Sequence, residues 1–170
     1  MPNIFKAMIP SACYAHFYDI PFDELLKAGK DTMLLDYDNT LGPDRTWEPN
    51  EFSRKIVADL RGRGFAICLV SNAKSARSAN IAKLLDIPCV TCANKPRTDG
   101  VNRALSLMGV GRDKAVMIGD QIFTDVMAGN LAGVTAILVE PFSKKEIWYV
   151  KIKRPFERLV RLIAGIKTRA

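Results

Sequence analysis

The chain has 170 residues, of which 48% are apolar and 25% are charged, and its formal net charge is +7. This length fits one domain over residues 1–170, and the composition is that of a globular protein rather than a disordered or fibrous one. No apolar run approaches the ~20 residues of a membrane-spanning helix, and the N-terminus lacks the continuous apolar segment of a signal peptide. We therefore expect a cytoplasmic protein.

Apolar runs alternate with helix-like segments along the chain, which predicts an α/β fold with a mainly parallel sheet between helices. The five expected strands cover residues 32–36, 65–70, 88–91, 115–118 and 134–139. Helices are expected near residues 51–63, 73–85, 99–108 and 124–131. In such open sheets ligands bind beyond the carboxyl ends of the strands. The residues that follow each strand are therefore candidates for one common site.

Two carboxylates, Asp36 and Asp38, follow the first expected strand in the sequence DYDNTL. Because they stand two residues apart, both can face the same crevice. A bound divalent cation would relieve their mutual repulsion. One carboxylate could then attack phosphorus while the other serves the leaving oxygen. A solvated acidic turn would explain an isolated DxD, but it does not explain DYDNTL directly after an apolar strand.

Three polar residues follow the next two strands. Ser71 and Asn72 come directly after the second strand, where a hydroxyl and backbone N–H groups at a helix start suit a phosphate oxygen. A plain helix cap is the alternative for Ser71. Lys95 follows the third strand and could neutralise charge on a transferred phosphoryl group, or could be a surface lysine.

The fourth strand is followed by GDQIFTD, residues 119–125. Asp120 would point into the same crevice as a further metal ligand. Asp125 would open the next helix, where it could cap the helix, bind a metal-bound water or orient Lys95.

Taken together, DYDNTL, Ser71, Lys95 and GDQIFTD resemble the four motifs of the haloacid dehalogenase (HAD) superfamily. The resemblance implies a Rossmann-like sheet and a phosphatase in which Asp36 becomes an aspartyl phosphate and Asp38 is the general acid and base. It implies Mg²⁺ held by the carboxylates of Asp36 and Asp120 and the backbone carbonyl of Asp38. Ser71, Asn72 and Lys95 would bind the phosphoryl oxygens, and Thr40 and Asp125 would support the site.

A closer resemblance is to the YqeG-type branch of HAD subfamily IIIA, which includes mitochondrial phosphatidylglycerophosphate phosphatases. It rests on the segments LLKAGKDTMLLDYDNTL, SNA, LDIP, GDQIFTDVMAGNLAGVTAILVEP and RPFERLVRLI. It implies dephosphorylation of phosphatidylglycerophosphate to phosphatidylglycerol at a membrane surface. The loop 42–50 and the segment 71–88 are too short to hold a cap domain. We therefore expect a capless, open site that suits a phosphate on a large body.

The C-terminal residues 143–170 form a basic tail outside the core of about 30–140. They contain nine Lys and Arg against two Glu, an excess as large as the whole net charge of +7. A helix is expected from Pro155, in its first turn, to Ile166. Its apolar stripe would comprise Phe156, Leu159, Val160, Ile163 and Ile166. The stripe could lie on an anionic membrane or dock on the sheet. Residues 1–28 could form a second contact surface or pack beneath the tail.

Other functions remain open from the sequence. The substrate could instead be a nucleic-acid terminal phosphate, a phosphoprotein or a small phosphate ester, although no aromatic-basic surface of the kind that stacks nucleic acid is evident. A non-catalytic interaction module is the alternative of another class, but it would not need three site carboxylates. A membrane-bound form would be peripheral on the inner face, or on the matrix side in mitochondria. The sequence does not indicate an oligomeric state.

Two residue pairs have the spacing of zinc ligands, Cys13 with His16 and Cys89 with Cys92. Free cysteines in or beside an apolar strand are more often small buried hydrophobic residues. Zinc binding by these four residues is therefore the weaker interpretation.

Overall fold

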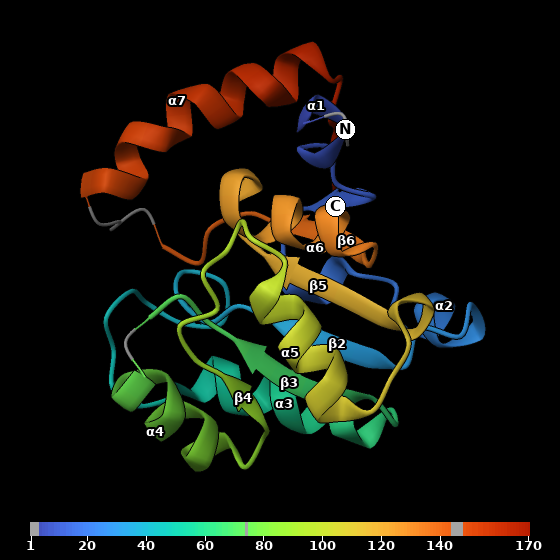
Figure 1. The fold of residues 1–170 in the computed structure, drawn as a ribbon, viewed down its shortest axis with the longest axis vertical. Coiled ribbons are helices and arrows are strands. Elements are labelled where there is room, and N and C mark those ends of the chain that lie inside the picture. Colours follow the sequence, from blue (N-terminus) through green and yellow to red (C-terminus); the bar gives the residue numbers. More distant parts are fainter. Residues whose placement is uncertain (1–3, 74, 144–147) are drawn as a thin grey trace.

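The computed structural model describes residues 4–73, 75–143 and 148–170, which form one parallel sheet with helices on both faces (Figure 1). The sheet has seven strands in the order β4-β3-β2-β5-β6-β1-β7. Their bounds are β1 Ala12–Tyr14, β2 Thr32–Leu35, β3 Ala66–Val70, β4 Cys89–Val90, β5 Ala115–Gly119, β6 Thr135–Val139 and β7 Thr168–Arg169. The α/β class is confirmed, and the five expected strands are β2 to β6.

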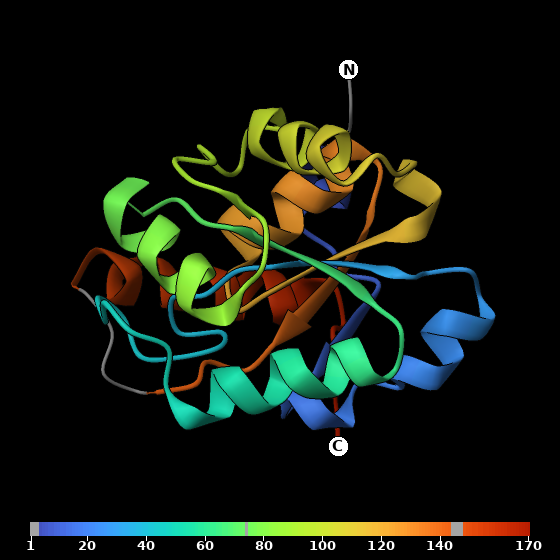
Figure 2. The ribbon, with the colours of Figure 1, turned by 90° about the horizontal axis from the view of Figure 1, so that it is seen from below.

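The helices form two layers around this sheet (Figure 2). Their bounds are α1 Ile4–Ala7, η1 Phe17–Asp19, α2 Phe22–Lys27, α3 Glu51–Gly62, α4 Ser75–Leu85, α5 Asp99–Met108, η2 Arg112–Lys114, the π-helix η3 Ile122–Val126, α6 Met127–Ala132 and α7 Trp148–Ile163. Helices α2, α3 and α4 cover one face of the sheet, and α5 and α6 cover the other.

The apolar strands are buried on both faces, as their composition predicts. Leu35 of β2 packs into the core beneath α3 and α4, whereas its neighbour Leu34 packs beneath α5 and α6. Because successive side chains of a strand point to opposite faces, a strand with both faces covered needs apolar residues at every position. Burial of these runs fixes where each strand ends, and thereby which residues reach the carboxyl edge.

Two short strands at one sheet edge, β1 and β7, lie outside the five that the sequence predicts. Cys13 of β1 pairs with Leu138 of β6 on one side and with Thr168 of β7 on the other. A segment from residues 1–28 and a segment of the basic tail therefore complete the same sheet. The expected count of five strands is wrong for this reason.

The expected bounds of the tail helix are also wrong. Helix α7 is described from Trp148, so Pro155 lies inside it rather than in its first turn, and α7 ends at Ile163. The sixteen-residue helix tolerates an interior proline that lacks an N–H for the carbonyl four residues earlier. Residues 144–147 of the basic tail lie outside the described residues.

No cap domain covers the carboxyl edge of the sheet in the described part of the chain. Between β2 and α3 runs a loop without helix or strand, and between β3 and β4 lies only α4. None of the described helices combines the length and apolarity needed to cross a membrane.

Candidate active site

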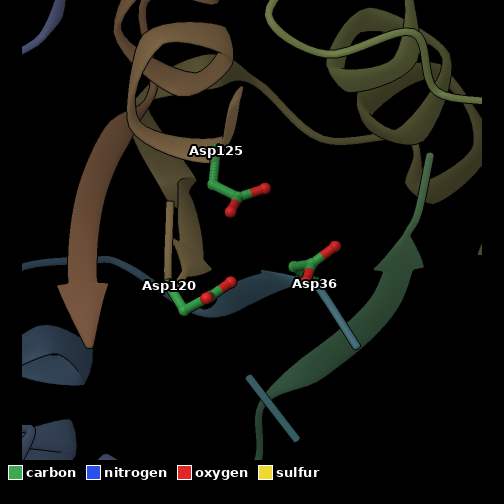
Figure 3. Close-up of side chains that lie close together, drawn as sticks. All are labelled: Asp36, Asp120 and Asp125. Atoms are coloured by element: carbon green, nitrogen blue, oxygen red, sulfur yellow. The ribbon is translucent and has the colours of Figure 1, made fainter. Parts of the chain in front are cut away.

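Three buried aspartates meet at the carboxyl edge of the sheet (Figure 3). Asp36 follows β2 and Asp120 follows β5, and these strands are neighbours in which Leu35 pairs with Ile118. Asp125 projects from η3. One carboxylate oxygen from each of the three lies within 4.8 Å of the others. The sheet thus brings carboxylates from both ends of a sequence span of ninety residues into one cluster.

Gly119 allows Asp125 to reach this cluster. A Cβ atom at position 119 would lie 2.3 Å from Cγ of Asp125, which no side chain permits. The other Asp125 oxygen, Oδ2, accepts a hydrogen bond of 3.1 Å from the backbone N–H of Gln121. The glycine of the GDQIFTD segment is therefore required by the close approach of the aspartate that ends it.

Lys95 is the buried cation of the cluster. Its Nζ lies 2.7 Å from Oδ1 of Asp36 and 2.6 Å from Oδ1 of Asp125, and it donates to the carbonyl of Val70 at 2.7 Å. The contacts with Asp36 and Val70 are hydrogen bonds, whereas the contact with Asp125 is an ion pair, and Oδ1 of Asp125 is left without a hydrogen-bond donor among the described residues. Lys95 is therefore no surface lysine, and its single positive charge is shared between the two carboxylates that it joins.

Burial controls the ionisation of these groups. Loss of hydration raises the pKa of Asp36 to about 7, although Lys95 opposes that rise. Burial also raises the pKa of Asp120 well above its usual range, against the opposing effect of Arg154. Burial acts to lower the pKa of Lys95, but Asp125 and Asp36 outweigh it and raise that pKa. Burial thus disfavours the ionised form of both aspartates.

The donor set of the cluster fits a hard divalent cation. Hard cations such as Mg²⁺ take oxygen ligands and few carboxylates, and all three groups here offer carboxylate oxygens. Thr40 lies beside two of them, with its Oγ1 3.2 Å from Oδ2 of Asp36 and 3.3 Å from Oδ1 of Asp120. Asp36 and Asp120, which the sequence predicts as ligands, are within the cluster, and Asp125 adds a third carboxylate.

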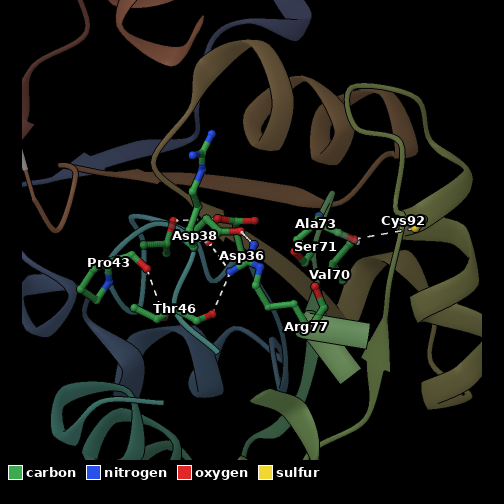
Figure 4. A network of polar contacts seen from close by, with 12 residues as sticks. Asp36, Asp38, Pro43, Thr46, Val70, Ser71, Ala73, Arg77 and Cys92 are labelled. Carbon is green, nitrogen blue, oxygen red and sulfur yellow. Dashed lines mark hydrogen bonds and ion pairs between the residues drawn. The ribbon is translucent and has the colours of Figure 1, made fainter. Parts of the chain in front are cut away.

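The side chain of Asp38 points to a separate partner, Arg77 of α4 (Figure 4). Nη1 of Arg77 donates to Oδ1 of Asp38 at 2.8 Å and to the carbonyl of Thr46 at 3.1 Å, and Nη2 contacts Oδ2 of Asp38. The backbone N–H of Arg45 also donates to Oδ1, at 3.3 Å. The carboxylate of Asp38 is thus beside the cluster of three aspartates but outside it. Arg77 is a site residue that is not among those expected from the sequence.

A cavity of about 610 Å³ opens over this arrangement. Four groups of residues line it. The first comprises the expected site residues Asp36, Asp38, Asn72, Lys95 and Asp125, and the second the loop residues Asp44, Arg45 and Trp47. The third comprises Ala76 and Arg77 of α4, and the fourth Val150 and Lys153 of α7. Ala73, Gln121 and Thr124 complete the lining. The carboxylates therefore face a space large enough for a phosphate ester, with α7 at one side of it.

Comparison with known proteins identifies the family. A family model described as HAD-hydrolase-like matches residues 92–145. The protein named probable phosphatase YqeG of Bacillus subtilis (strain 168) is 30% identical over 165 residues, which cover 95% of this chain and 93% of that protein. The chain belongs to the HAD superfamily. Within it, the chain is of the YqeG type, and it is a phosphatase.

Solved structures of low sequence identity share the HAD fold of this chain. A hypothetical protein from Xanthomonas campestris superposes with a TM-score of 0.55 at 15% identity, covering 89% of this chain and 93% of that one. A cobalt-bound deoxy-D-mannose-octulosonate 8-phosphate phosphatase from Haemophilus influenzae gives 0.53 at 13% identity, with 82% and 92% covered.

In this HAD phosphatase, Asn72 and Ser71 hold the loops around the cavity. Asn72 Nδ2 donates to the carbonyl of Lys95 at 3.0 Å, and the Lys95 N–H donates to Asn72 Oδ1 at 2.8 Å. The hydroxyl oxygen of buried Ser71 accepts from the Ala73 N–H at 3.1 Å. The two-way contact of Asn72 positions the Lys95 backbone. Phosphate binding by these residues stays a prediction.

Two tail residues, Arg154 and Glu157, also belong to the HAD site, although neither is expected there from the sequence. Arg154 of α7 contacts Oδ2 of Asp120 and donates to the Asp120 carbonyl at 2.8 Å and to Glu157 at 2.8 Å. Buried Glu157 accepts from the Ile122 N–H at 2.8 Å, at the start of η3. Its negative charge is favourable at a helix N-terminus. Helix α7 therefore binds the segment from Asp120 to Ile122 through two side chains.

The four candidate zinc residues cannot hold one ion. Cys13 is on β1 and Cys89 is on β4, and β3, β2, β5 and β6 lie between those strands. At ~4.8 Å per strand step, the two pairs are too far apart to share a metal. Burial also raises the pKa of the Cys89 thiol to about 11, which disfavours the thiolate that binds zinc.

Proposed function

We propose that the protein is a Mg²⁺-dependent phosphomonoesterase that dephosphorylates phosphatidylglycerophosphate at a membrane surface, with Asp36 as the nucleophile. One observation carries the chemistry: Asp36 lies at the end of β2, 2.7 Å from Lys95, within a carboxylate cluster that faces the cavity. Few other arrangements need a carboxylate buried beside two more carboxylates.

The proposed reaction has two displacements at phosphorus. A carboxylate oxygen of Asp36 attacks phosphorus, the bond to the ester oxygen breaks, and Asp38 gives that oxygen a proton. Asp38 then takes a proton from water, whose oxygen attacks phosphorus and breaks the bond to Asp36. The cation would supply electrophilic stabilisation of the phosphoryl oxygens. Both oxygens of Asp38 now face Arg77, so this role requires the carboxylate to turn towards the phosphoryl group.

Three features support a phospholipid as substrate. The carboxyl edge has no cap in the described chain, so a phosphate on a large body can approach. The cavity is lined by the cations Arg77 and Lys153 as well as Lys95, which suits an ester with two phosphate groups. The YqeG-type membership agrees with the resemblance to phosphatidylglycerophosphate phosphatases. That resemblance is the reason for proposing phosphatidylglycerophosphate as the lipid.

The test is phosphate release with Mg²⁺ from phosphatidylglycerophosphate in anionic vesicles, beside an aryl phosphate and a 5′-phosphorylated oligonucleotide. We expect kcat/KM for the lipid to exceed both others by at least ~10²-fold, because remote parts of a true substrate contribute to transition-state binding. The Asp36→Asn variant is the blank. Equal activity on all three would contradict the lipid assignment but leave the phosphatase chemistry standing. Preference for the oligonucleotide would replace the lipid by a nucleic-acid end.

Mg²⁺ is expected to raise the melting temperature, and to raise it more at pH 8 than at pH 6. The pKa of Asp36 is raised to about 7, so a proton competes with the cation at pH 6 and has largely left at pH 8. Thermal unfolding with and without about 5 mM Mg²⁺ measures the shift. Asp120→Asn should remove most of it. An equal shift in that variant would place the cation elsewhere.

A further inference from the structure

Helix α7 presents an apolar side to solvent. The exposed large apolar residues of α7 are Trp148, Ile152, Phe156, Leu159, Leu162 and Ile163. Except for the adjacent Leu162 and Ile163, successive residues of this set are three or four positions apart, which places them along one side of the helix. Leu162 is 79% exposed and Trp148 is 70% exposed, so these side chains are not half-covered by neighbours. In Figure 1 the helix forms one extremity of the molecule.

The opposite side of α7 holds the helix on the protein, and it is largely charged. Arg154 and Glu157 bind the Asp120 segment, and Arg161 lies 2.5 Å from Glu140. Val150 and Val160 add the apolar contacts of this side. An amphipathic helix of a globular protein normally buries its apolar side and exposes its charges. Helix α7 does the reverse.

The expected stripe is split by this arrangement. Phe156, Leu159 and Ile163 are exposed, whereas Val160 and Ile166 pack against the cluster that contains Cys13 and Ile122. Part of the expected stripe thus docks on the core, and contact of the rest with a membrane stays a prediction. The helix docks on the core, yet most of its apolar stripe remains available. An apolar surface of this kind marks a binding site rather than a chance exposure.

The charges around the exposed side indicate its partner. Among the described side chains of α7, the exposed charged residues are Lys151 and Arg158, and the acidic residue Glu157 is buried. Lys167 and Arg169, just beyond the helix, are also exposed. A helix side that is apolar, with basic flanks and without an exposed carboxylate of its own, matches an anionic lipid surface. There, apolar residues enter the acyl boundary and cations meet the headgroups.

The position of α7 relative to the cavity favours the same partner. Val150 and Lys153, on α7, line the cavity that Asp36 faces. Because Val150 belongs to the docked side, a helix lying in the lipid interface would hold the cavity about one helix diameter, ~10 Å, from that interface. A phosphate on a headgroup that projects from the bilayer could then approach the site.

We propose that the outward side of α7, comprising Trp148, Ile152, Phe156, Leu159, Leu162 and Ile163 with Lys151 and Arg158, is the surface by which the protein binds an anionic phospholipid bilayer. This inference deepens the proposed function and rests on its lipid substrate. It adds which residues enter the membrane and that the helix stays docked on the core through its charged side while they do so.

Vesicle binding tests this surface without turnover. The full chain is mixed with vesicles of phosphatidylglycerol and phosphatidylcholine, or of phosphatidylcholine alone, and the bound fraction is measured by flotation. Neither lipid is a phosphomonoester, so a failure of the proposed substrate cannot affect the result. We expect binding to the anionic vesicles that weakens as salt rises. Phe156→Ser with Leu159→Ser should weaken it at least ~tenfold, because two apolar anchors are lost.

The matched control is Leu84→Ser with Leu107→Ser, on α4 and α5. These leucines are 41% and 57% exposed, against 60% and 52% for Phe156 and Leu159, so the changes are alike in kind but lie elsewhere. The control should bind vesicles as the unchanged protein does, and both variants should keep activity on an aryl phosphate. Equal binding by all three proteins, or no binding to anionic vesicles, would overturn the proposal. A dimer in solution that the α7 variant dissociates would assign the surface to a second copy instead.

Discussion

Replacing Asp36 with Asn is expected to lower phosphomonoester turnover by at least about 10⁴-fold and to leave the fold intact. The amide has the shape of the carboxylate but cannot attack phosphorus to form the covalent intermediate. Lys95 keeps Asp125 and the Val70 carbonyl as partners, so its charge stays compensated. Phosphate release from an aryl phosphate measures the loss, and thermal unfolding verifies the fold.

Asp86→Asn is the control for this change. The Asp86 side chain is 94% exposed and distant from the cluster in the sequence and the fold, so its replacement should not alter turnover. Turnover by Asp36→Asn within tenfold of the unchanged protein would mean that another group attacks phosphorus. Either result can be interpreted only if Asp36→Asn unfolds at the same temperature as the unchanged protein.

Replacing Lys95 with Met is expected to reduce both stability and turnover. The change leaves the buried carboxylates of Asp36 and Asp125 without their cation, which costs about 3–5 kcal/mol of unfolding free energy near pH 8. The folded-state pKa of Asp36 is already raised, and it rises further without Lys95. Folded protein then holds protons that unfolded protein has released, so the penalty grows as pH rises from 5.5 to 8. Turnover should fall at least ~10²-fold.

Urea unfolding at pH 5.5 and pH 8 measures this penalty. Adding Asp125→Asn to Lys95→Met should restore part of the stability at pH 8, because one of the unpaired carboxylates is removed. Lys83→Met, on the exposed surface of α4, is the matched control and should have little effect. A loss that is equal at both pH values and is not restored by the second substitution would show that Lys95 acts through packing alone.

The sequence predicts the central fold because burial on both faces leaves a plain signal. Strands β2 to β6 are almost entirely apolar, and polar residues follow them, such as Asp36 after β2, Ser71 after β3 and Asp120 after β5. The amino-acid sequence alone therefore places Asp36, Asp120 and Lys95 at one edge of the sheet. Their joint location follows from parallel pairing.

The two strands at the β1–β7 edge of the sheet cannot be predicted in this way. Strand β1 has three residues and β7 has two, and the residues of β7, Thr168 and Arg169, are exposed. Segments this short have no periodicity of their own, and they become strands only by pairing with a neighbour. The sequence separation of Cys13 and Thr168, which are partners across 155 positions, gives no local signal either.

Arg77 and Arg154 show a second limit. Each is a long side chain on a helix, and each reaches a site carboxylate from another element. In sequence both look like solvated charges, because an ion pair between elements depends on how those elements dock. Glu157 is similar, since only the docked position of α7 places it at the start of η3. An acidic residue within a strongly basic segment is the one signal that could have drawn attention to it.

The contacts between α7 and the segment that carries Asp120 have a thermodynamic consequence. Arg154 binds Asp120, and Glu157 accepts a hydrogen bond from the backbone N–H of Ile122 two residues later, so whatever favours one position of the helix acts on a carboxylate of the cluster. Linkage between two binding sites is reciprocal: a factor by which one ligand changes the affinity for the other applies equally in reverse. If a bilayer binds α7 and a divalent cation binds the carboxylates, binding of either one changes the affinity of the protein for the other. Helix α7 would then couple the membrane-binding surface to the active site. The same coupling free energy would be obtained from the effect of the cation on vesicle binding and from the effect of vesicles on cation binding.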